Sequence, residues 1–381
     1  MRNLWKIENF ADVMKPSLFI CRLYGLLPYR MENEKITRSR LINIYCIAFT
    51  TLYLIFSMLN LYILNASSYV KRISTWMLQS NCFYALANFI IVSNAAFGSQ
   101  VITILRTLEK VTRKLPKSEL DKVAKWIRIK DLIVYALLIV HAPALFSGDI
   151  YNWIAKVIAS YATTAIYLLD LQYSSYVYIL GSCFKFINAE LARLKDKAFT
   201  EKAHLLRRVY HRRFNPTLFV KLRHLKQWHY KLNEAIRKIN LTFSLQIIST
   251  LILTFTELTF GLYFNIYDMR HKNVRSLNNE VWYCYYYTLV VYYTLKLFLL
   301  TLTCQFTNDE NDKSHIIINE ILINTDDKLF KEELYLFSLQ LLHTNNTFIA
   351  KGVKIDATLL TAMAKGIFTY LLILIQFLVS S

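Results

Sequence analysis

The chain has 381 residues, of which 55% are hydrophobic, and a formal net charge of +19. This apolar content is too high for an ordinary soluble enzyme, and the low numbers of glycine (7) and proline (5) argue against a fold dominated by strands and loops. The sequence also lacks the GxGxxG, Walker, HExxH and GxSxG motifs, so we expect neither an enzyme nor a bound cofactor.

Seven long apolar stretches predict membrane-spanning helices. They cover residues 41–64, 74–105, 131–150, 153–187, 239–268, 281–306 and 357–380. Each has at least the roughly 20 residues that a helix needs to cross a hydrocarbon core of about 30 Å. We therefore predict an all-α membrane protein with seven transmembrane helices. Its segments are expected to be 1–40 before the bundle, 41–306 with helices 1 to 6, 307–356 as a connection, and 357–381 with helix 7. Polar residues interrupt the second and third stretches, so six or eight spans are the alternatives.

Lysine and arginine are distributed unevenly between the connections. The segments 1–40, 106–130, 185–238 and 307–358 hold 37 of them, and the other three connections hold 5. Cytoplasmic segments are enriched in basic residues, so we expect a cytosolic amino terminus and, with seven spans, an outer carboxyl terminus. A net positive charge also fits nucleic-acid binding, but basic runs between spans are better explained by the inner membrane face and its anionic lipids. No nucleic-acid partner is expected.

The long inner connections are predicted to be helical. Between 185 and 238 apolar residues recur at helical spacing, and 328–342 shows the same pattern directly after Asp326 and Asp327, which suit a helix start. In 328–342 the apolar face is expected to comprise Leu329, Leu334, Phe337 and Leu341. We expect spans four and five to continue as helices beyond the membrane and to pack together below it, in a cytosolic helical cluster that holds subunits together. A monomer that packs on itself is the alternative.

The six cysteines and eight histidines form no recognisable site. The cysteines lie in predicted spans or on the inner side, so no outer disulfide framework is expected, and no Cys/His spacing fits zinc. We therefore predict no metal site. The sequon at Asn65, Ala66 and Ser67 falls in the first outer loop, which makes Asn65 a glycosylation candidate.

The last apolar stretch has two chemically different faces. Projected as a helix, it places small or polar residues on one stripe: Ala362, Lys365, Gly366, Thr369, Ile373 and Gln376. Tyr370 and Phe377 border this stripe, and large apolar residues cover the opposite side. Polar groups in a bilayer face a neighbouring helix or a water-filled cavity, so interhelical hydrogen bonding and a pore both remain open at this point.

The stretch "TYLLILIQF" carries a spaced motif, with Thr369 and Tyr370 followed after five residues by Gln376 and Phe377. It resembles the carboxyl-terminal motif of insect gustatory receptors, and residues 348–377 are similar to the end of that family. The resemblance implies a ligand-gated, nonselective cation channel that detects small-molecule tastants in the plasma membrane of chemosensory neurons. It also implies a homotetramer, or a heterotetramer with related receptors, in which helices 4 to 6 and the first part of helix 7 form a helical cytosolic anchor.

The same resemblance implies that each subunit gives its seventh helix to a central pore. The pore and gate residues are then expected to be Thr369, Tyr370, Ile373, Gln376 and Phe377. Gln376 and Phe377 would lie near the narrow outer part of that pore. Lys365 departs from this arrangement, because a ring of four lysines repels cations unless the side chains reach the inner interface instead.

Ligand recognition is expected in the outer halves of helices 2 to 6, where aromatic and polar residues gather. The candidates are Tyr84, Asn88, His141, Tyr161, Asp170, Glu257, Tyr263, Glu280, Trp282 and Tyr286. Each of them can equally be an interhelical contact or an interface anchor. Asp170 and Glu257 stand out, because a carboxylate within a span is costly without a partner.

Two other function classes remain open. A seven-helix G-protein-coupled receptor needs an outer amino terminus, which the charge distribution opposes. A secondary transporter more often shows internal repeats and spans broken by glycine or proline, and the sequence shows neither.

Overall fold

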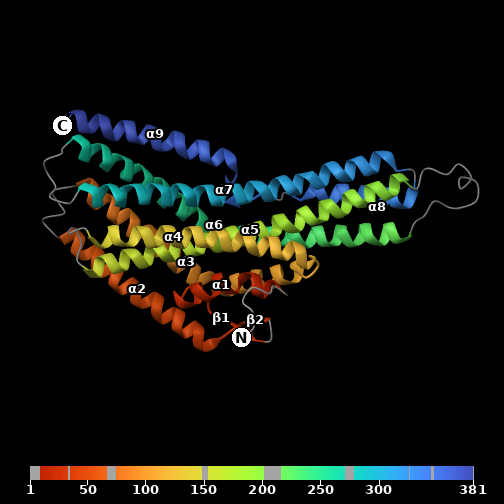
Figure 1. Ribbon diagram of the computed structural model, residues 1–381, viewed down its shortest axis with the longest axis horizontal. Helices are drawn as coiled ribbons and strands as arrows, with labels where there is room; N and C mark the ends of the chain where they lie inside the picture. The colour runs from red at the N-terminus through yellow and green to blue at the C-terminus, as the bar shows by residue number, and fades with distance from the viewer. Residues whose placement is uncertain are drawn as a thin grey trace, which may run out of the picture.

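The computed structural model describes residues 9–32, 35–66, 74–147, 153–200, 216–270, 279–325, 327–344 and 347–380. Nine helices and two short hairpins are formed by these residues. The helices make one elongated bundle, with a broad half at the end where the chain finishes and a narrow half at the other end (Figure 1).

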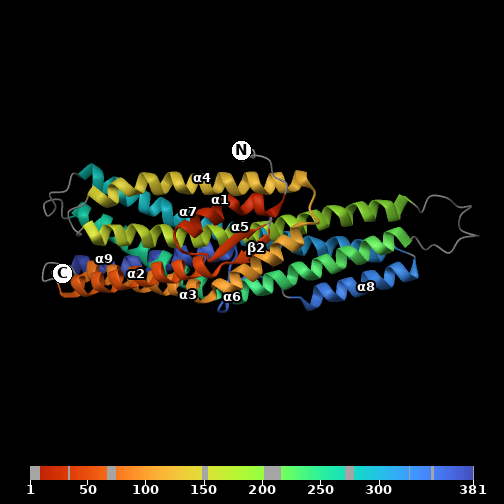
Figure 2. The same ribbon diagram turned by 90° about the horizontal axis from the view of Figure 1, so that it is seen from below.

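Six helices of the described chain are long and apolar enough to cross a membrane. They are α2 (Arg40–Ala66), α3 (Ser74–Thr112), α5 (Trp153–Thr200), α6 (Pro216–Arg270), α7 (Asn279–Asn324) and α9 (Ala357–Ser380). The remaining predicted span belongs to α4 (Lys117–Ser147), which runs along the broad half of the bundle (Figures 1 and 2). The first half of α4 is rich in charged residues, and the apolar stretch occupies its second half.

A helix and a hairpin that the sequence analysis did not predict precede the bundle. They are α1 (Phe10–Leu23), β1 (Tyr29–Glu32) and β2 (Lys35–Arg38), the two strands being antiparallel. α1 ends before Gly25, whose φ of +70° suits glycine, and the backbone N–H of Leu26 donates to the Cys21 carbonyl at 2.9 Å. Met14 and Leu18 are fully buried, so α1 is part of the packed core.

Three helices continue far beyond the length that a membrane requires. α5, α6 and α7 contain 48, 55 and 46 residues, whereas about 20 residues span a bilayer. Their ends form the narrow half of the bundle together with α8 (Lys328–His343) (Figure 1). We call this part the extension, and it comprises residues 185–200, 216–238, 307–324 and α8. The helical pattern predicted for 185–238 is confirmed for the described residues: Ile187, Leu191, Leu222 and Leu232 are fully buried.

α8 begins where the sequence predicts a helix start. The Asp327 carboxylate accepts hydrogen bonds from the backbone N–H of Leu329 at 3.1 Å and of Phe330 at 3.4 Å. Leu334 and Phe337 are buried as expected. The expectation for Leu329 is wrong, since its side chain is 54% exposed and Phe330 is buried instead. Phe330 lies four residues before Leu334 and so shares its face, whereas Leu329 lies five residues before it.

α5 and α7 approach each other closely at Gly181. A Cβ atom at Gly181 would lie 2.6 Å from the hydroxyl oxygen of Thr307, so a larger residue forces a shift. The Thr307 hydroxyl donates to the Val177 carbonyl at 3.0 Å. Further along, the Ser314 hydroxyl donates to the side-chain oxygen of Asn188 at 2.6 Å. These contacts join α5 to α7 as both helices enter the extension.

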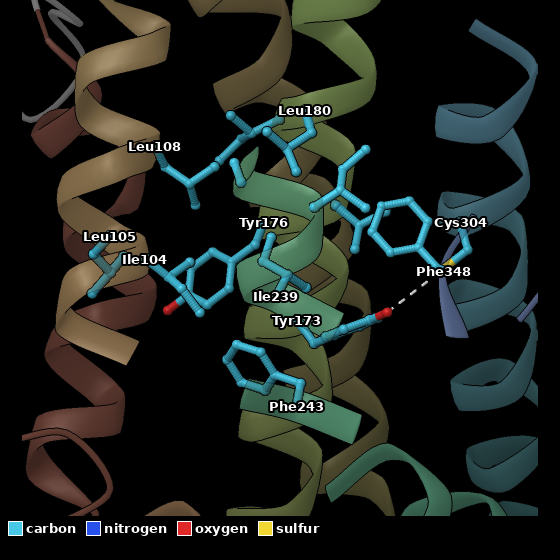
Figure 3. Packing of buried hydrophobic residues seen from close by; sticks show 14 of the residues in the cluster. Ile104, Leu105, Leu108, Tyr173, Tyr176, Leu180, Ile239, Phe243, Cys304 and Phe348 are labelled. Atoms are coloured by element: carbon cyan, nitrogen blue, oxygen red, sulfur yellow. Dashed lines mark hydrogen bonds between the residues drawn. The ribbon is translucent and has the colours of Figure 1, made fainter. Parts of the chain in front are cut away.

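The core where α3, α5, α6 and α7 meet is filled by large side chains (Figure 3). The ring of Phe243 on α6 lies 5.6 Å from that of Tyr173 and 5.9 Å from that of Tyr176, both on α5. The Tyr173 hydroxyl lies 3.7 Å from the sulfur of Cys304 on α7. Phe348 is fully buried in the same cluster and so fixes the start of the segment that leads into α9.

A second hairpin connects the extension to α9. Its strands are β3 (Ile349–Ala350) and β4 (Val353–Lys354). Lys351 and Gly352 form the turn with φ values of +49° and +90°. The hairpin is tied to α6, because the Lys351 backbone N–H donates to the Ser244 hydroxyl at 3.0 Å and the Asn240 side chain donates to the Thr347 carbonyl at 2.9 Å. The prediction of an all-helical chain did not include either hairpin, since strands of two to four residues leave almost no periodic pattern.

Candidate pore helix and ligand site

α9 is the least buried of the apolar helices. In its most apolar 18-residue window 6% of the residues are buried, against 28% to 67% in the other five candidate spans. It is the outermost helix on one side of the bundle (Figure 1). A helix this apolar and this poorly covered by its own chain needs lipid or other subunits as its surroundings.

The five residues of the expected pore motif all lie on the exposed part of α9. Thr369 and Gln376 are exposed, and the exposed fractions of Ile373 and Phe377 are 41% and 69%. Tyr370 is more than half exposed, and its ring meets that of Phe255 on α6 edge-on at 5.6 Å.

The face of α9 that meets α6 contains Gly366. A Cβ atom at Gly366 would lie 3.0 Å from the Phe255 ring, so this glycine permits the close packing of the two helices. The sequence projection placed Gly366 on the polar stripe. The polar stripe is therefore narrower than expected and runs through Lys365, Thr369 and Gln376, which are all exposed.

The start of α9 is held by Asp356. Its carboxylate accepts hydrogen bonds from the Thr358 hydroxyl and from the Thr358 backbone N–H, the latter at 3.0 Å. It also lies 2.9 Å from the Lys354 ammonium group. The hydrogen bonds from Thr358, together with the Lys354 charge, hold the pKa of Asp356 below its usual value. A negative charge at this position caps the helix and favours its dipole.

Two of the ligand candidates lie in one buried polar cluster between α3, α5, α6 and α7. Asp170 is 2.8 Å from the ammonium nitrogen of Lys296 and accepts a hydrogen bond from the Thr250 hydroxyl at 3.3 Å. Glu257 accepts a hydrogen bond from the Gln79 amide at 2.9 Å, and its other carboxylate oxygen is buried without a hydrogen-bond partner among the described residues. We call these five residues the polar cluster.

Aromatic side chains stand beside the polar cluster. The rings of Tyr167 and Tyr292 stack at 4.3 Å, and the ring of His141 stacks on Tyr292 at 6.3 Å. A ring nitrogen of His141 is 2.9 Å from the Thr288 hydroxyl. The Tyr292 hydroxyl donates to the carbonyl of Thr163 at 3.0 Å. Carboxylates, an ammonium group and stacked rings together can bind a small ligand through both polar and apolar contacts.

The other ligand candidates make separate contacts. Asn88 accepts a hydrogen bond from Ser57 at 2.9 Å and so joins α3 to α2, and Tyr84 donates to the Ala155 carbonyl at 3.4 Å. Tyr161 stacks on Tyr24, the residue that follows α1, and donates to the Tyr24 carbonyl at 3.0 Å.

Tyr161, Tyr84 and Asn88 therefore hold helices together. Tyr263 packs against Phe264, and the Tyr286 ring packs near Gly261 where α6 meets α7. The side chains of Glu280 and Trp282 lie outside the described part of the chain.

The sequence analysis missed Lys296, the partner of Asp170. The available signal was a single lysine inside the apolar stretch 281–306, which is costly unless it is paired. It also missed a second buried pair. Lys130 lies 2.9 Å from Asp131 and donates to the Ser175 hydroxyl at 3.0 Å, which joins α4 to α5.

The long apolar helices, the buried ion pairs within them and the uncovered apolar helix α9 define a polytopic helical membrane protein. A family model described as 7tm Chemosensory receptor matches residues 14–379. The chain therefore belongs to this family of receptors, which are not enzymes. The resemblance to gustatory receptors that the carboxyl-terminal motif indicated is confirmed.

Two relatives from Drosophila melanogaster match parts of the chain. Putative gustatory receptor 28b is 25% identical over 152 residues, which are 39% of this chain and 32% of that protein. Gustatory receptor for sugar taste 43a is 26% identical over 159 residues, which are 41% of this chain and 36% of that protein. The match thus spans about a third of the length of each relative.

Solved structures show the fold over almost the whole chain. The insect olfactory receptor OR5 from Machilis hrabei superimposes with a TM-score of 0.71 at 13% identity and covers 96% of this chain and 97% of its own. The same receptor in complex with eugenol gives a TM-score of 0.67 at 15% identity, with the same coverage.

Proposed function

We propose that this chain is a subunit of a ligand-gated, nonselective cation channel of the gustatory type. The exposure of α9 carries this proposal, because an amphipathic membrane helix with polar residues on its uncovered side suits a pore formed by several copies. In this arrangement Thr369, Ile373, Gln376 and Phe377 line the pore and Tyr370 borders it. The amino terminus is cytosolic and the channel lies in the plasma membrane of chemosensory neurons.

Four subunits form the channel, either as copies of this chain or together with related receptors. Apolar side chains on the outside of the extension support assembly, since they lie beyond the span length and need cover from water. The most exposed of them are Ile316, Ile323 and Leu342 on α7 and α8 and Tyr230 on α6, followed by Leu329 and Tyr335 on α8. The extension is then the cytosolic anchor, and neighbouring subunits bury these residues.

The ligand is a small-molecule tastant that binds at or near the polar cluster. The name of one relative gives sugar taste as its role, and a solved receptor of the same fold was bound to eugenol, so small ligands are known for proteins similar to this chain. In the cluster, Glu257 has a carboxylate oxygen without a hydrogen-bond partner among the described residues, and the stacked rings of Tyr167 and Tyr292 stand beside it. A ligand with hydroxyl or amine groups suits this combination.

Electrophysiology of pore variants tests the channel. Phe377→Ala removes a large apolar ring from a narrow part of the pore, so ligand-independent current should rise. Gln376→Glu places carboxylates there and should raise the permeability to divalent relative to monovalent cations. Currents are normalised to surface protein. Parent-like leak and permeability in both variants, at normal surface levels, would contradict a pore lined by α9.

A ligand-site variant separates recognition from permeation. Glu257→Gln keeps the shape of the side chain and should shift the agonist dose–response at least about tenfold, because a charge-assisted contact is lost. The reversal potential should stay unchanged, because Glu257 is buried inside the bundle, where its carboxylate accepts a hydrogen bond from Gln79 on α3. A changed reversal potential with unaltered agonist sensitivity would contradict this assignment.

A further inference from the structure

The uncovered side of α9 carries one cation. Thr361, Lys365, Thr369 and Gln376 are exposed and follow each other at steps of four, four and seven residues, which places them along one line of the helix. The hydroxyl of Thr369 donates to the backbone carbonyl of Lys365 at 2.9 Å, so this hydroxyl has a hydrogen-bond acceptor within the helix itself. The ammonium group of Lys365 is the charged member of this line.

Lys365 has no ion-pair partner among the residues that the structure describes. The nearest acidic residue along the chain, Asp356, is buried and paired with Lys354. An unpaired ammonium group in an apolar helix needs water or a headgroup, because its burial in hydrocarbon costs several kcal/mol. Lys365 lies 11 residues before Gln376, about 16 Å along the helix axis.

We propose that Lys365 faces the pore and lowers the permeability of divalent relative to monovalent cations. This inference rests on the proposed channel with α9 around its axis. Four subunits then place four ammonium groups at one level, in the half of the pore nearer to the hairpin. The repulsion of an ion grows with its charge, so a ring of lysines disfavours a divalent cation about twice as strongly, in free energy, as a monovalent one. Lys365 is therefore a selectivity-determining residue.

Charge variants at Lys365 test this proposal. Lys365→Gln should raise the ratio of calcium to sodium permeability at least about threefold, and Lys365→Glu should raise it further. Lys365→Arg keeps the charge and should keep the parent ratio. The matched control is Lys351→Gln, which removes an exposed lysine from the hairpin turn outside α9 and should also keep the parent ratio. Surface biotinylation corrects for expression.

Chemical modification adds a charge at position 365 after the channel has assembled, so the test does not depend on how well each charge variant folds. Lys365→Cys channels in inside-out patches are treated with a cationic or an anionic methanethiosulfonate reagent. The cationic reagent should restore the parent ratio and the anionic one should raise it further. The parent channel serves as the control for its own cysteines, of which Cys21, Cys46, Cys183 and Cys304 are buried and Cys82 is partly exposed.

Two patterns of results separate the possible failures. An altered ratio in Gln376→Glu, together with parent-like ratios in all Lys365 variants and no effect of either reagent, overturns the role of Lys365 and places its side chain at lipid headgroups. Parent-like ratios in both the Gln376 and the Lys365 variants overturn the channel model in which α9 lines the pore.

Discussion

The ammonium nitrogen of Lys296 on α7 lies 2.8 Å from a carboxylate oxygen of Asp170 on α5, and the exposed fractions of the two residues are 3% and 4%. Neither charge has access to water, so each is stable mainly because the other is present. The pair fixes the relative position of two helices at the polar cluster. Any ligand that competes for either charge would alter how α5 and α7 pack.

Removing one member of this pair is expected to destabilise the protein strongly. Lys296→Met or Asp170→Asn leaves an uncompensated buried charge, which typically costs about 3–5 kcal/mol. The double variant, Lys296→Met with Asp170→Asn, should recover much of the loss because no unpaired charge remains. Thermal unfolding of the detergent-purified protein measures this. Additive losses in the double variant would show that the two charges are not coupled.

Gly181 is expected to tolerate no side chain. Gly181→Val places its Cβ within 2.6 Å of the Thr307 hydroxyl, and overpacking of this kind costs about 1–3 kcal/mol. The melting temperature should fall accordingly. Gly98→Ala is the matched control, since its Cβ would meet Pro28 at an ordinary 3.6 Å. Equal melting temperatures for the two variants would mean that α5 and α7 can separate at little cost.

The extension should lose stability in mild acid through His229. This side chain is fully buried between the rings of Phe184 and Phe337, at 5.0 and 5.5 Å, and hydrogen-bonds to Asn233 at 3.2 Å. Burial, followed by the nearby charge of His315, lowers the pKa of His229 to about 3. The unfolded chain, with a pKa near 6.5, therefore binds the proton more readily.

The contribution of His229 to the free energy of unfolding is complete above the unfolded pKa. This contribution is lost as the pH falls from about 6.5 towards 3, by roughly 1.4 kcal/mol for the first pH unit. The parent protein should thus melt at a lower temperature at pH 5.5 than at pH 7.5. His229→Phe keeps the aromatic packing and should show a smaller pH dependence. An equal slope in both proteins would assign the effect to other groups.

Asn65 is expected to remain without a glycan. Its amide nitrogen, which a glycan would occupy, donates to Asn81 on α3 at 3.0 Å and to the Leu61 carbonyl at 2.8 Å. Asn81 donates in return to Asn65 at 3.0 Å, so the two amides clamp α2 to α3. Treatment with a peptide N-glycosidase should leave the electrophoretic mobility unchanged. A mobility shift that Asn65→Gln abolishes would show that Asn65 carries a glycan and that its hydrogen bonds with Asn81 do not prevent glycosylation.

Much of the fold follows from properties that act over short distances. Hydropathy and length predict the spans, and helical spacing predicts the extension, because each property depends on residues within one or two turns. The cap of α8 at Asp327 is local in the same way. The turn at Lys351 and Gly352 is also local, but two-residue strands beside it carry too little pattern to be read.

The candidate site is harder to predict, because its contacts join distant parts of the chain. Asp170 draws attention as a carboxylate within a span, yet nothing near it in the sequence indicates that Lys296 is its partner. Tyr161 has the same chemistry as Tyr167 but stacks on Tyr24 at the end of α1, which the sequence analysis did not expect to be a helix. The two chemically different faces of α9 can be predicted from its sequence, whereas the low coverage of this helix by its own chain, with 6% of its most apolar window buried, required the structure.

α6 runs without interruption from Pro216 to Arg270. It carries a ligand candidate and also contacts the hairpin that precedes α9. Glu257 lies on it, and 13 residues earlier Ser244 holds the turn of the hairpin that leads into α9. A helix of this kind behaves as a stiff rod of about 20 Å between the two points. A tilt of α6 at Glu257 would therefore displace Ser244 and, through it, the hairpin before the first turn of α9.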